Sequence, residues 1–188
     1  MESPWLGNRI SRSCCRADAM YFDKKGLTDE GFSGFTSFAE LALSEVPQSS
    51  GVYAVLMPEG FAPRFLVTSA GGHFKGKDPS VAEDVLSAKW VTEAEVLYIG
   101  KAGAGKTAKR GLRKRIQEFV DFGRGAPVGH WGGRLLWQLA DSQDLAIAWK
   151  VLPPGLVDAT EARYHADFLA VHGQLPFANL VQSRTPQP

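Results

Sequence analysis

The chain contains few cysteines and no long apolar run. Its two cysteines, Cys14 and Cys15, are adjacent, so they cannot join distant loops, and the pattern excludes a secreted disulfide scaffold. No apolar stretch approaches the roughly 20 residues that cross a bilayer. The first 20 residues also lack the apolar block of a signal peptide. These absences predict a soluble, cytoplasmic protein that does not enter a membrane.

The net charge of the whole chain is also small. There are 21 Lys and Arg against 20 Asp and Glu, so the net charge is +1 and the whole molecule is not attracted strongly to polyanions. Hydrophobic residues make up 44% of the 188 positions, which is enough for one domain with a real core. Residues 1–20 show no periodic pattern. We therefore expect a poorly ordered segment there and a single domain over residues 21–188.

Positive charge is nevertheless concentrated in residues 101–118. This stretch holds seven Lys and Arg against one Glu, a local net charge of +6. Such a run is typical of a surface that binds nucleic-acid phosphates, although a solvated helix face has the same composition. The candidates for phosphate contact in this stretch are Lys101, Lys106, Lys109, Arg110 and Arg113.

Hydrophobic spacing and breaker residues predict a mixed α/β domain. Runs of β-branched and aliphatic residues predict strands over residues 52–57, 64–69, 95–100, 135–139 and 146–152. Helical periodicity predicts helices over residues 36–46, 81–87, 107–122 and 158–172. Short connections between several of the strands favour a small, mainly antiparallel sheet with helices packed against it.

A glycine-rich segment between a predicted strand and a predicted helix is one candidate site. Residues 100–107 (GKAGAGKT) satisfy the phosphate-loop pattern, in which Lys106 reaches the terminal phosphates and Thr107 binds magnesium. A nucleotide-hydrolysing domain of this kind also needs a parallel sheet and an Asp that holds magnesium after a second strand. Asp141 is the candidate, but it follows a segment predicted as one arm of a hairpin. A P-loop NTPase is therefore the weaker interpretation.

Five short motifs, taken in order, favour another interpretation. Residues 51–53 (GVY) open one predicted strand, and residues 98–100 (YIG) close another. Residues 112–116 (LRKRI) lie in the basic helix, with an Arg three positions after a Leu. Glu161 lies in the last predicted helix, and Asn179 ends the run LPFAN. In this order the motifs resemble those of the GIY-YIG nuclease family.

The resemblance extends over residues 47–181 and implies both a fold and a function. It implies a small mixed sheet flanked by helices, with an insertion at about residues 58–94, because 45 positions separate Tyr53 from Tyr98. It implies metal-dependent endonuclease activity that hydrolyses phosphodiester bonds of DNA, with RNA as an open alternative. The catalytic residues that it implies are Tyr53, Tyr98, Arg115, Glu161 and Asn179.

Each of these residues has a chemical role that the resemblance implies. Glu161 would hold one divalent cation, Mg²⁺ or another ion such as Mn²⁺, which retains several waters. Tyr53 or Tyr98 would activate water, and antiparallel neighbours on one face lie close together. A phenol with a pKa near 10 is a poor base at neutral pH. We therefore expect Arg115 and Lys101 to favour the phenolate and to stabilise the phosphate.

Other features of the sequence favour less specific interpretations. Phe119 stands four positions after Arg115, where the family usually has Tyr or His, so a nucleic-acid-binding module of the same fold without catalysis is the main alternative. Tyr53 and Tyr98 also fit ordinary half-buried strand tyrosines. Asp158 and Glu161 have the spacing of a capping box, in which the Glu needs no metal.

Histidines supply two further candidates. His130 lies in the glycine-rich run GHWGGR, where it is a candidate base or phosphate contact, or simply part of a structural turn. Glu161 and His165 are four positions apart on one predicted helix face, with His172 seven positions further on. This spacing is compatible with a metal pair, but no third ligand is evident, so a zinc site is a weak interpretation.

Overall fold

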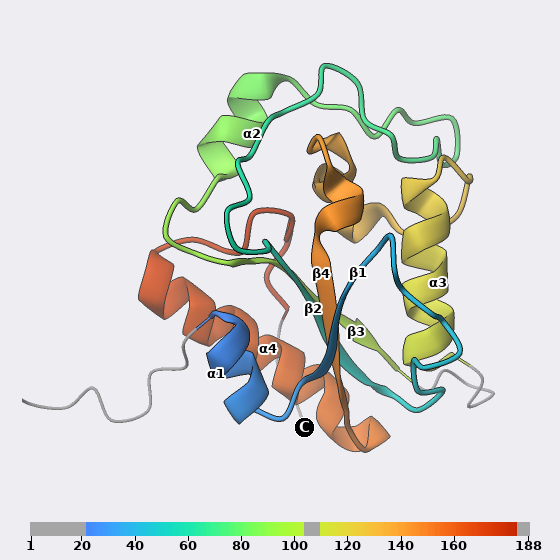
Figure 1. Cartoon of the computed structure of the whole chain (residues 1–188), viewed down its shortest axis with the longest axis vertical. Helices are drawn as coiled ribbons and strands as arrows, with labels where there is room; N and C mark the ends of the chain where they lie inside the picture. The colour runs from blue at the N-terminus through green and yellow to red at the C-terminus, as the bar shows by residue number, and fades with distance from the viewer. Residues whose placement is uncertain (1–21, 104–109, 184–188) are drawn as a thin grey trace, which may run out of the picture.

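A four-stranded antiparallel sheet forms the centre of the computed structural model, which describes residues 22–103 and 110–183 (Figure 1). The strands lie in the order β1-β4-β2-β3, and every neighbouring pair is antiparallel. This arrangement confirms the predicted fold class, a mixed α/β domain with a mainly antiparallel sheet and packed helices. The strands are β1 (Ser33–Ser37), β2 (Gly51–Leu56), β3 (Val96–Ala102) and β4 (Ala146–Val151).

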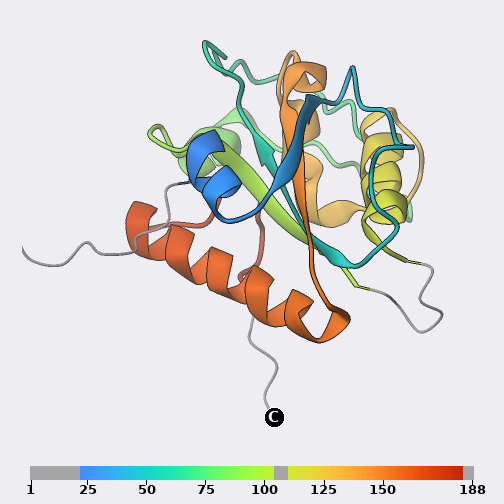
Figure 2. The same cartoon turned by 60° about the horizontal axis from the view of Figure 1, so that its bottom comes forward.

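Helices cover both faces of the sheet, with α3 on one face and α4 on the other (Figures 1 and 2). Alternation along β2 divides its side chains between these faces. Tyr53 and Val55 join the cluster that includes α3, whereas Val52 and Ala54 join the cluster that includes α4. The helical elements are α1 (Lys24–Asp29), α2 (Glu83–Lys89), α3 (Leu112–Gly123), η1 (Trp131–Gln138), η2 (Ser142–Asp144) and α4 (Pro154–His172).

The predicted strands at residues 52–57, 95–100 and 146–152 correspond to β2, β3 and β4, with boundaries that move by one or two positions. The predicted helices at residues 81–87 and 158–172 correspond to α2 and α4. The helix predicted from residue 107 begins at Leu112, within the described part of the chain, because Gly111 adopts an extended backbone before it.

The helix predicted over residues 36–46 is wrong. Its first residues instead complete β1, where Ser37 pairs with Ala146 at the start of β4, and turns follow. Gly34 has a φ of 99°, and a Cβ there would lie 2.6 Å from the Trp149 ring. Pairing with β4 and close packing on this indole thus override the helical spacing of the apolar residues.

The strands predicted over residues 64–69 and 135–139 are also wrong. The two segments meet only in a single bridge between Phe65 and Leu139, and most of the second segment lies in η1. The Gln138 side chain makes several hydrogen bonds to the backbone of the long β2–β3 connection. It donates to the carbonyls of Leu66 and Val81 at 2.9 and 2.7 Å and accepts from the Val81 N–H at 2.9 Å. Hence the buried Gln138 amide, together with a few backbone hydrogen bonds such as that from the Leu66 N–H to the Gln138 carbonyl at 2.8 Å, joins the long β2–β3 connection to η1.

Three further predictions concern the insertion, the N-terminal segment and membrane spans. The chain between β2 and β3, where we expected an insertion at about residues 58–94, contains α2 and long loops. The predicted poorly ordered segment, residues 1–20, lies outside the described residues. In the described ranges, no helix has both the length and the apolar character of a membrane span.

Candidate active site

Tyr53 and Tyr98 lie side by side on the face of the sheet that α3 covers. Tyr53 pairs with Gly100 across β2 and β3, and Tyr98 pairs with Val55, so the tyrosines are diagonal neighbours. Their ring centroids are 5.9 Å apart. A Cβ at Gly100 would lie 2.6 Å from the Tyr53 ring carbon Cζ. Glycine at this position therefore leaves the space in which the Tyr53 phenol lies.

Both tyrosines are buried. Tyr53 has no exposed surface and Tyr98 is 6% exposed. Burial raises the pKa of both phenols, and that of Tyr53 well above its usual value, because the charged phenolate loses its hydration. The positive charge of Arg115 acts in the opposite direction on the pKa of each phenol. The two tyrosines thus share one cation but differ in their access to solvent.

Arg115 reaches this pair because the start of α3 is docked against the segment before β2. The backbone N–H groups of Leu112 and Arg113 donate to the carbonyls of Ser49 and Pro47 at 2.9 and 3.0 Å. Arg115 then lies, partly buried, in the first turn of α3, where its Nη1 is 3.5 Å from Glu118 Oε2. Docking of the helix start therefore sets the position of the guanidinium.

The other basic candidates have different surroundings. Arg110 forms an ion pair with Glu118, with nitrogen and oxygen 3.0 Å apart. Arg113 donates to the carbonyls of Ser44 and Val46 at 2.7 and 2.8 Å, so it ties the preceding loop to α3 instead of facing solvent freely. The remaining two basic candidates, Lys106 and Lys109, lie outside the described residues.

Lys101 lies on the opposite face of β3 from the tyrosines and contacts two carboxylates of α4. Its Nζ is 2.8 Å from Glu161 Oε2 and 3.0 Å from Asp158 Oδ1. Although burial lowers the pKa of Lys101, the hydrogen bonds and charges of the two carboxylates raise it overall. Glu161 is buried, and its Oε2 also accepts a short hydrogen bond from the Ser183 hydroxyl.

The capping-box prediction for Asp158 and Glu161 is wrong. Helix α4 begins at Pro154, with Pro153 as its N-cap residue, so Asp158 lies inside the helix rather than before it. Proline at the first helical position suits a helix start because its missing N–H would be unpaired there in any case. Asp158 consequently lies on the same helix face as Glu161, beside Lys101. It is the carboxylate that sequence reasoning missed as a site residue.

Asn179 has a structural position at the edge of the sheet. Its side-chain oxygen accepts from the Ile99 N–H at 2.9 Å, and its side-chain nitrogen donates to the Ile99 carbonyl at 2.8 Å. The amide therefore pairs with both backbone groups of an edge residue that would otherwise lack a partner strand. In this way Asn179 holds the chain after α4 against β3, beside the strand that carries Tyr98 and Lys101.

His165 is packed next to Asn179, with no metal-binding cluster around it. Its Nδ1 accepts from the Ser183 N–H at 3.0 Å, and its Nε2 lies 3.4 Å from the Ile99 carbonyl. Burial lowers the pKa of His165, which favours the neutral ring. Across residues 22–103 and 110–183, no group of three His, Cys, Asp or Glu side chains is arranged to hold a metal ion. Glu161 is thus not part of a preformed group of three such ligands among the described residues.

A cavity of about 340 Å³ opens at the end of β3, between the basic helix and α4. Its charged lining has three cations and two carboxylates: Lys101, Arg110, Arg115, Glu118 and Asp158. Tyr53, Tyr98 and Glu161 are not among its lining residues. The charges of Arg115 and Lys101 nevertheless lower the pKa of the Tyr98 phenol, while that of Glu161 raises it. The structure therefore brings four of the predicted site residues into one electrostatic neighbourhood.

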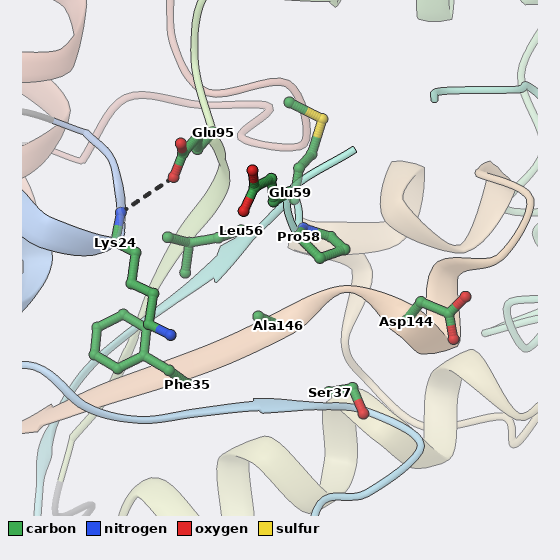
Figure 3. A pocket seen from close by; sticks show the side chains of 10 residues that line it. Lys24, Phe35, Ser37, Leu56, Pro58, Glu59, Glu95, Asp144 and Ala146 are labelled. Carbon is green, nitrogen blue, oxygen red and sulfur yellow. Dashed lines mark hydrogen bonds between the residues drawn. The ribbon is translucent and has the colours of Figure 1, made fainter. Parts of the chain in front are cut away.

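A larger cavity, of about 550 Å³, lies near the ends of β2 and β4 away from the tyrosines, and Figure 3 shows its lining. Three acidic residues, Glu59, Glu95 and Asp144, line it together with one cation, Lys24. The Glu95 carboxylate accepts from the Lys24 backbone N–H at 3.1 Å (Figure 3). An excess of negative charge repels phosphate, so this cavity does not suit a nucleic acid.

The surroundings of the glycine-rich segment do not match those of a phosphate loop. Strand β3, which precedes it, is an edge strand that pairs antiparallel with β2. Asp141 forms an exposed ion pair with Arg64, with nitrogen and oxygen 2.6 Å apart. The second half of the segment, residues 104–107, which includes Lys106 and Thr107, lies outside the described residues. The parallel sheet that phosphate-loop enzymes use is thus absent from the described part of the chain.

Comparison with known proteins does not identify the chain. No family model, curated protein or solved structure matches it.

Proposed function

We propose that this protein is a metal-dependent endonuclease that hydrolyses phosphodiester bonds of DNA. One observation carries the proposal. Lys101 of β3, Arg115 of α3 and Asp158 of α4 line one cavity although they are far apart in the sequence, and the Lys101 Nζ lies 2.8 Å from Glu161 Oε2. Two cations for the phosphate and neighbouring carboxylates for a metal ion are parts that phosphodiester hydrolysis uses.

The side chains divide the chemistry between them. Arg115 presents a planar guanidinium with several donors, which suits a phosphate whose negative charge grows as water attacks. Lys101 adds a second cation at the cavity wall. A tyrosine takes a proton from the attacking water, and Asn179 keeps β3 in place through the Ile99 backbone. Positioning and charge stabilisation, rather than covalent attack, are thus the contributions of these residues.

The donor set at Glu161 fits a hard divalent cation. Mg²⁺ is commonly bound by one or two carboxylates together with substrate phosphates and retained waters, and Glu161 with its neighbour Asp158 supplies such carboxylates. The cation, when bound, would supply charge stabilisation at the phosphate. Lys101 must then turn from Glu161 toward the phosphate, and its 39% exposed side chain leaves room for that movement.

Nicking of a supercoiled plasmid by the purified protein tests this proposal. We expect nicking with Mg²⁺ and none with EDTA, and we expect Glu161→Gln to slow it at least about 100-fold. Glu83→Gln, which changes an exposed glutamate of α2, is the matched control and retains the wild-type rate. Absence of nicking by the wild type, or equal rates for wild type and Glu161→Gln, would contradict the proposal.

A nucleic-acid-binding module without catalysis is the second candidate. Two features favour it. Tyr53 is fully buried, and the apolar Phe119 stands four positions after Arg115, where the family usually has Tyr or His. The two candidates differ in one result. The binding module retards labelled DNA in a gel without Mg²⁺ and never cuts it, whereas the endonuclease cuts. In both cases Lys101→Ala and Arg110→Ala should weaken retardation, increasingly so at higher salt.

A further inference from the structure

The glycine-rich run GHWGGR holds two basic side chains, His130 and Arg134, with opposite surroundings. His130 has no exposed surface, its Nε2 lies 3.2 Å from the Tyr53 hydroxyl, and its ring stacks on Phe119 at a centroid distance of 4.3 Å. This burial places His130 out of reach of a phosphate, so it does not serve as the surface contact that the sequence suggested. Arg134, four positions later, is only half-buried. It is therefore the cation of this run that a ligand can reach.

Arg134 lies in the first turn of η1, where its guanidinium is held against the ring of Trp131. The guanidinium carbon Cζ is 4.7 Å from the centroid of this ring, a distance at which a cation is attracted to an aromatic face. The indole in turn packs against Phe122 of α3, with ring centroids 6.4 Å apart. Two aromatic side chains thus fix the position of the guanidinium.

The guanidinium has no acceptor within the described residues. Its Nε and Nη1 atoms are buried without a hydrogen-bond partner. Burial lowers the pKa of Arg134, and no carboxylate of the described ranges opposes this effect. Arg163 shows the contrast, because a hydrogen bond to Glu30 raises its pKa. Arg134 is therefore a partly buried cation that lacks a counter-ion.

A cation in this state is stable only at a cost, which an anionic ligand removes. Buried donors without an acceptor lose the hydrogen bonds that water would give them. The guanidinium carries its donors in a planar fork that matches the oxygens of a phosphate. A phosphate at Arg134 would thus supply both the missing acceptors and the missing negative charge.

The first turn of η1 also lies against aromatic residues of the candidate active site. A Cβ at Gly132 would lie 3.3 Å from the Tyr98 hydroxyl, and one at Gly133 would lie 2.8 Å from the Phe119 ring. Gly132 is exposed, so solvent reaches the chain between Tyr98 and Arg134. The charge of Arg115 does not contribute to the lowered pKa of Arg134. The two guanidiniums therefore belong to neighbouring but separate positions.

Helix α3 gives the spacing between these positions. Phe122, on which Trp131 packs, follows Arg115 by seven residues in α3. Seven residues extend about 10 Å along a helix axis, which is the length of about three nucleotides in one strand of a DNA duplex. Arg134 thus lies at the distance of a phosphate that flanks the scissile one.

The connection between β2 and β3 adds positive charge near this place. Its turn at residues 73–78 packs on the run that carries Arg134, since a Cβ at Gly129 would lie 3.3 Å from the Phe74 ring, and Figure 1 shows the connection passing near the end of α3. Lys75 and Lys77 of this turn are exposed, against one carboxylate, that of Asp78. These lysines extend the positive surface beyond the cavity.

We infer that Arg134, held by Trp131, binds a backbone phosphate of duplex DNA about three nucleotides from the scissile phosphate. The inference rests on the proposed function, in which the cavity at the end of β3 receives the scissile phosphate. Lys75 and Lys77 attract the same stretch of DNA from the β2–β3 connection. The substrate is therefore DNA that continues past the cavity along α3, rather than a single nucleotide.

Equilibrium binding of a labelled DNA duplex in EDTA tests this contact without any cleavage. We expect Arg134→Met to weaken binding about 5- to 10-fold at about 0.1 M salt and to reduce the slope of log K against log salt by about one. Arg64→Met is the matched control, because Arg64 is exposed and already paired with Asp141, and it should change the affinity less than about twofold. Equal affinities for Arg134→Met and the wild type would overturn the inference.

Urea unfolding separates a ligand contact from a packing role. Arg134→Met keeps an unbranched side chain against Trp131 and removes the two buried nitrogens that have no partner. We therefore expect its urea midpoint to equal or exceed that of the wild type. A midpoint that falls together with the affinity, or a variant that does not fold, would mean that Arg134 acts through packing and would overturn the inference.

The position of the contact can be measured on DNA that the protein cuts. One neutral methylphosphonate linkage is placed about three nucleotides from the cut, on either side in turn. We expect it to slow cleavage by the wild type on one side and to leave the rate of Arg134→Met unchanged there. Equal slowing of both proteins on each side would contradict a contact between Arg134 and that phosphate.

Failure of the inference and failure of the proposed function give different results. A wild type that binds DNA more tightly than Arg134→Met but never cuts it refutes the endonuclease and retains the phosphate contact. A wild type that cuts DNA but has the same affinity as Arg134→Met retains the endonuclease and refutes the contact. A wild type that does not bind DNA refutes both.

Discussion

The two faces of the sheet treat their buried polar groups differently. On the α4 face, Lys101 pairs with Glu161, the Asn179 amide pairs with the Ile99 backbone, and Glu30 accepts from Tyr164 at 2.9 Å. On the α3 face, the Gln138 amide is paired, but four buried polar atoms of the described residues lack a hydrogen-bond partner. These atoms are His130 Nδ1, Arg134 Nε and Nη1, and Trp137 Nε1.

This difference assigns different roles to the two faces. A buried polar atom without a partner costs about 1–3 kcal/mol, so the residues from His130 to Trp137 carry an energetic cost that the α4 face avoids. Such atoms are few in native structures, and a catalytic role is one of the explanations for them. The paired α4 face therefore stabilises the fold, while the α3 face holds the tyrosines in one arrangement through aromatic packing and the contact between Tyr53 and His130.

The largest expected effect is loss of the aromatic packing on the α3 face. The Phe119 ring contacts five other rings, those of Phe38, Tyr53, Tyr98, His130 and Trp137. We expect Phe119→Ala to lower the free energy of unfolding by about 3–5 kcal/mol, measured in urea. Val181→Ala, at a 77% exposed position, should change it by less than about 0.5 kcal/mol. A loss below about 1.5 kcal/mol for Phe119→Ala would mean that this face is loosely packed.

The next effect probes the paired α4 side. Asn179→Leu removes both hydrogen bonds to Ile99 and leaves its N–H and carbonyl buried, so we expect a loss of about 3 kcal/mol in the free energy of unfolding. Gln174→Leu, which removes one half-buried bond to the Trp90 carbonyl, is the control and should cost about 1 kcal/mol or less. Equal losses for the two variants would contradict the structural role of Asn179.

The pH dependence of stability offers a third comparison. The unfolded chain protonates His130 near pH 6.5, whereas burial and Arg115 lower the folded-state pKa to about 2. The unfolded state therefore binds the extra proton below pH 6.5, and stability is lost as the pH falls, by about 1.4 kcal/mol per pH unit. Between pH 7 and pH 5, urea unfolding should show a loss in wild type that exceeds that in His130→Phe by about 2 kcal/mol. Equal losses would mean that His130 is not held neutral.

The smallest effect concerns the space beside Tyr53. A Cβ at Gly100 would lie 2.6 Å from Tyr53 and 2.8 Å from Tyr98, so Gly100→Ala should cost about 1–2 kcal/mol of unfolding free energy and disturb the near-ultraviolet circular dichroism of the tyrosines. Gly103 has nothing within 4 Å of such a Cβ, so Gly103→Ala is the matched control and should cost nothing measurable. Indistinguishable variants would show that the phenol tolerates displacement.

The sequence predicts the central elements of this fold well because their residues carry a local signal. Strand β2 is a run of small and β-branched residues between a turn and a proline, and β3 and β4 are similar. Tyr53 and Tyr98 lie close together on antiparallel neighbours, as expected, although the register makes them diagonal rather than directly opposite. Residues 36–46 and 135–139 have equally clear local patterns, but the packing of Gly34 on Trp149 and the hydrogen bonds of Gln138 to Leu66 and Val81 decide their structure. These contacts are distant in sequence, so no local pattern contains them.

The candidate site, like the fold, could be predicted only in part from local sequence patterns. The basic helix and Glu161 are visible in the sequence, but the ion pair that joins Lys101 to Glu161 depends on how α4 crosses β3. Asp158 was hidden by a spacing that also fits a helix cap, and Pro153-Pro154 was the signal that the helix begins earlier. The burial of His130 could not be read from a glycine-rich run, because glycines next to Phe119 and Tyr98 and glycines in solvent look alike.

A double-mutant cycle on DNA cleavage tests most directly whether the two faces serve one reaction. Arg115→Lys changes the α3 side and Glu161→Asp changes the α4 side, and each should slow Mg²⁺-dependent cleavage by about 10- to 100-fold. Residues that act on one transition state are not additive. We therefore expect the double variant to be at most about threefold slower than the slower single variant. Losses that multiply, or a wild type that does not cleave, would contradict a single site formed by both faces.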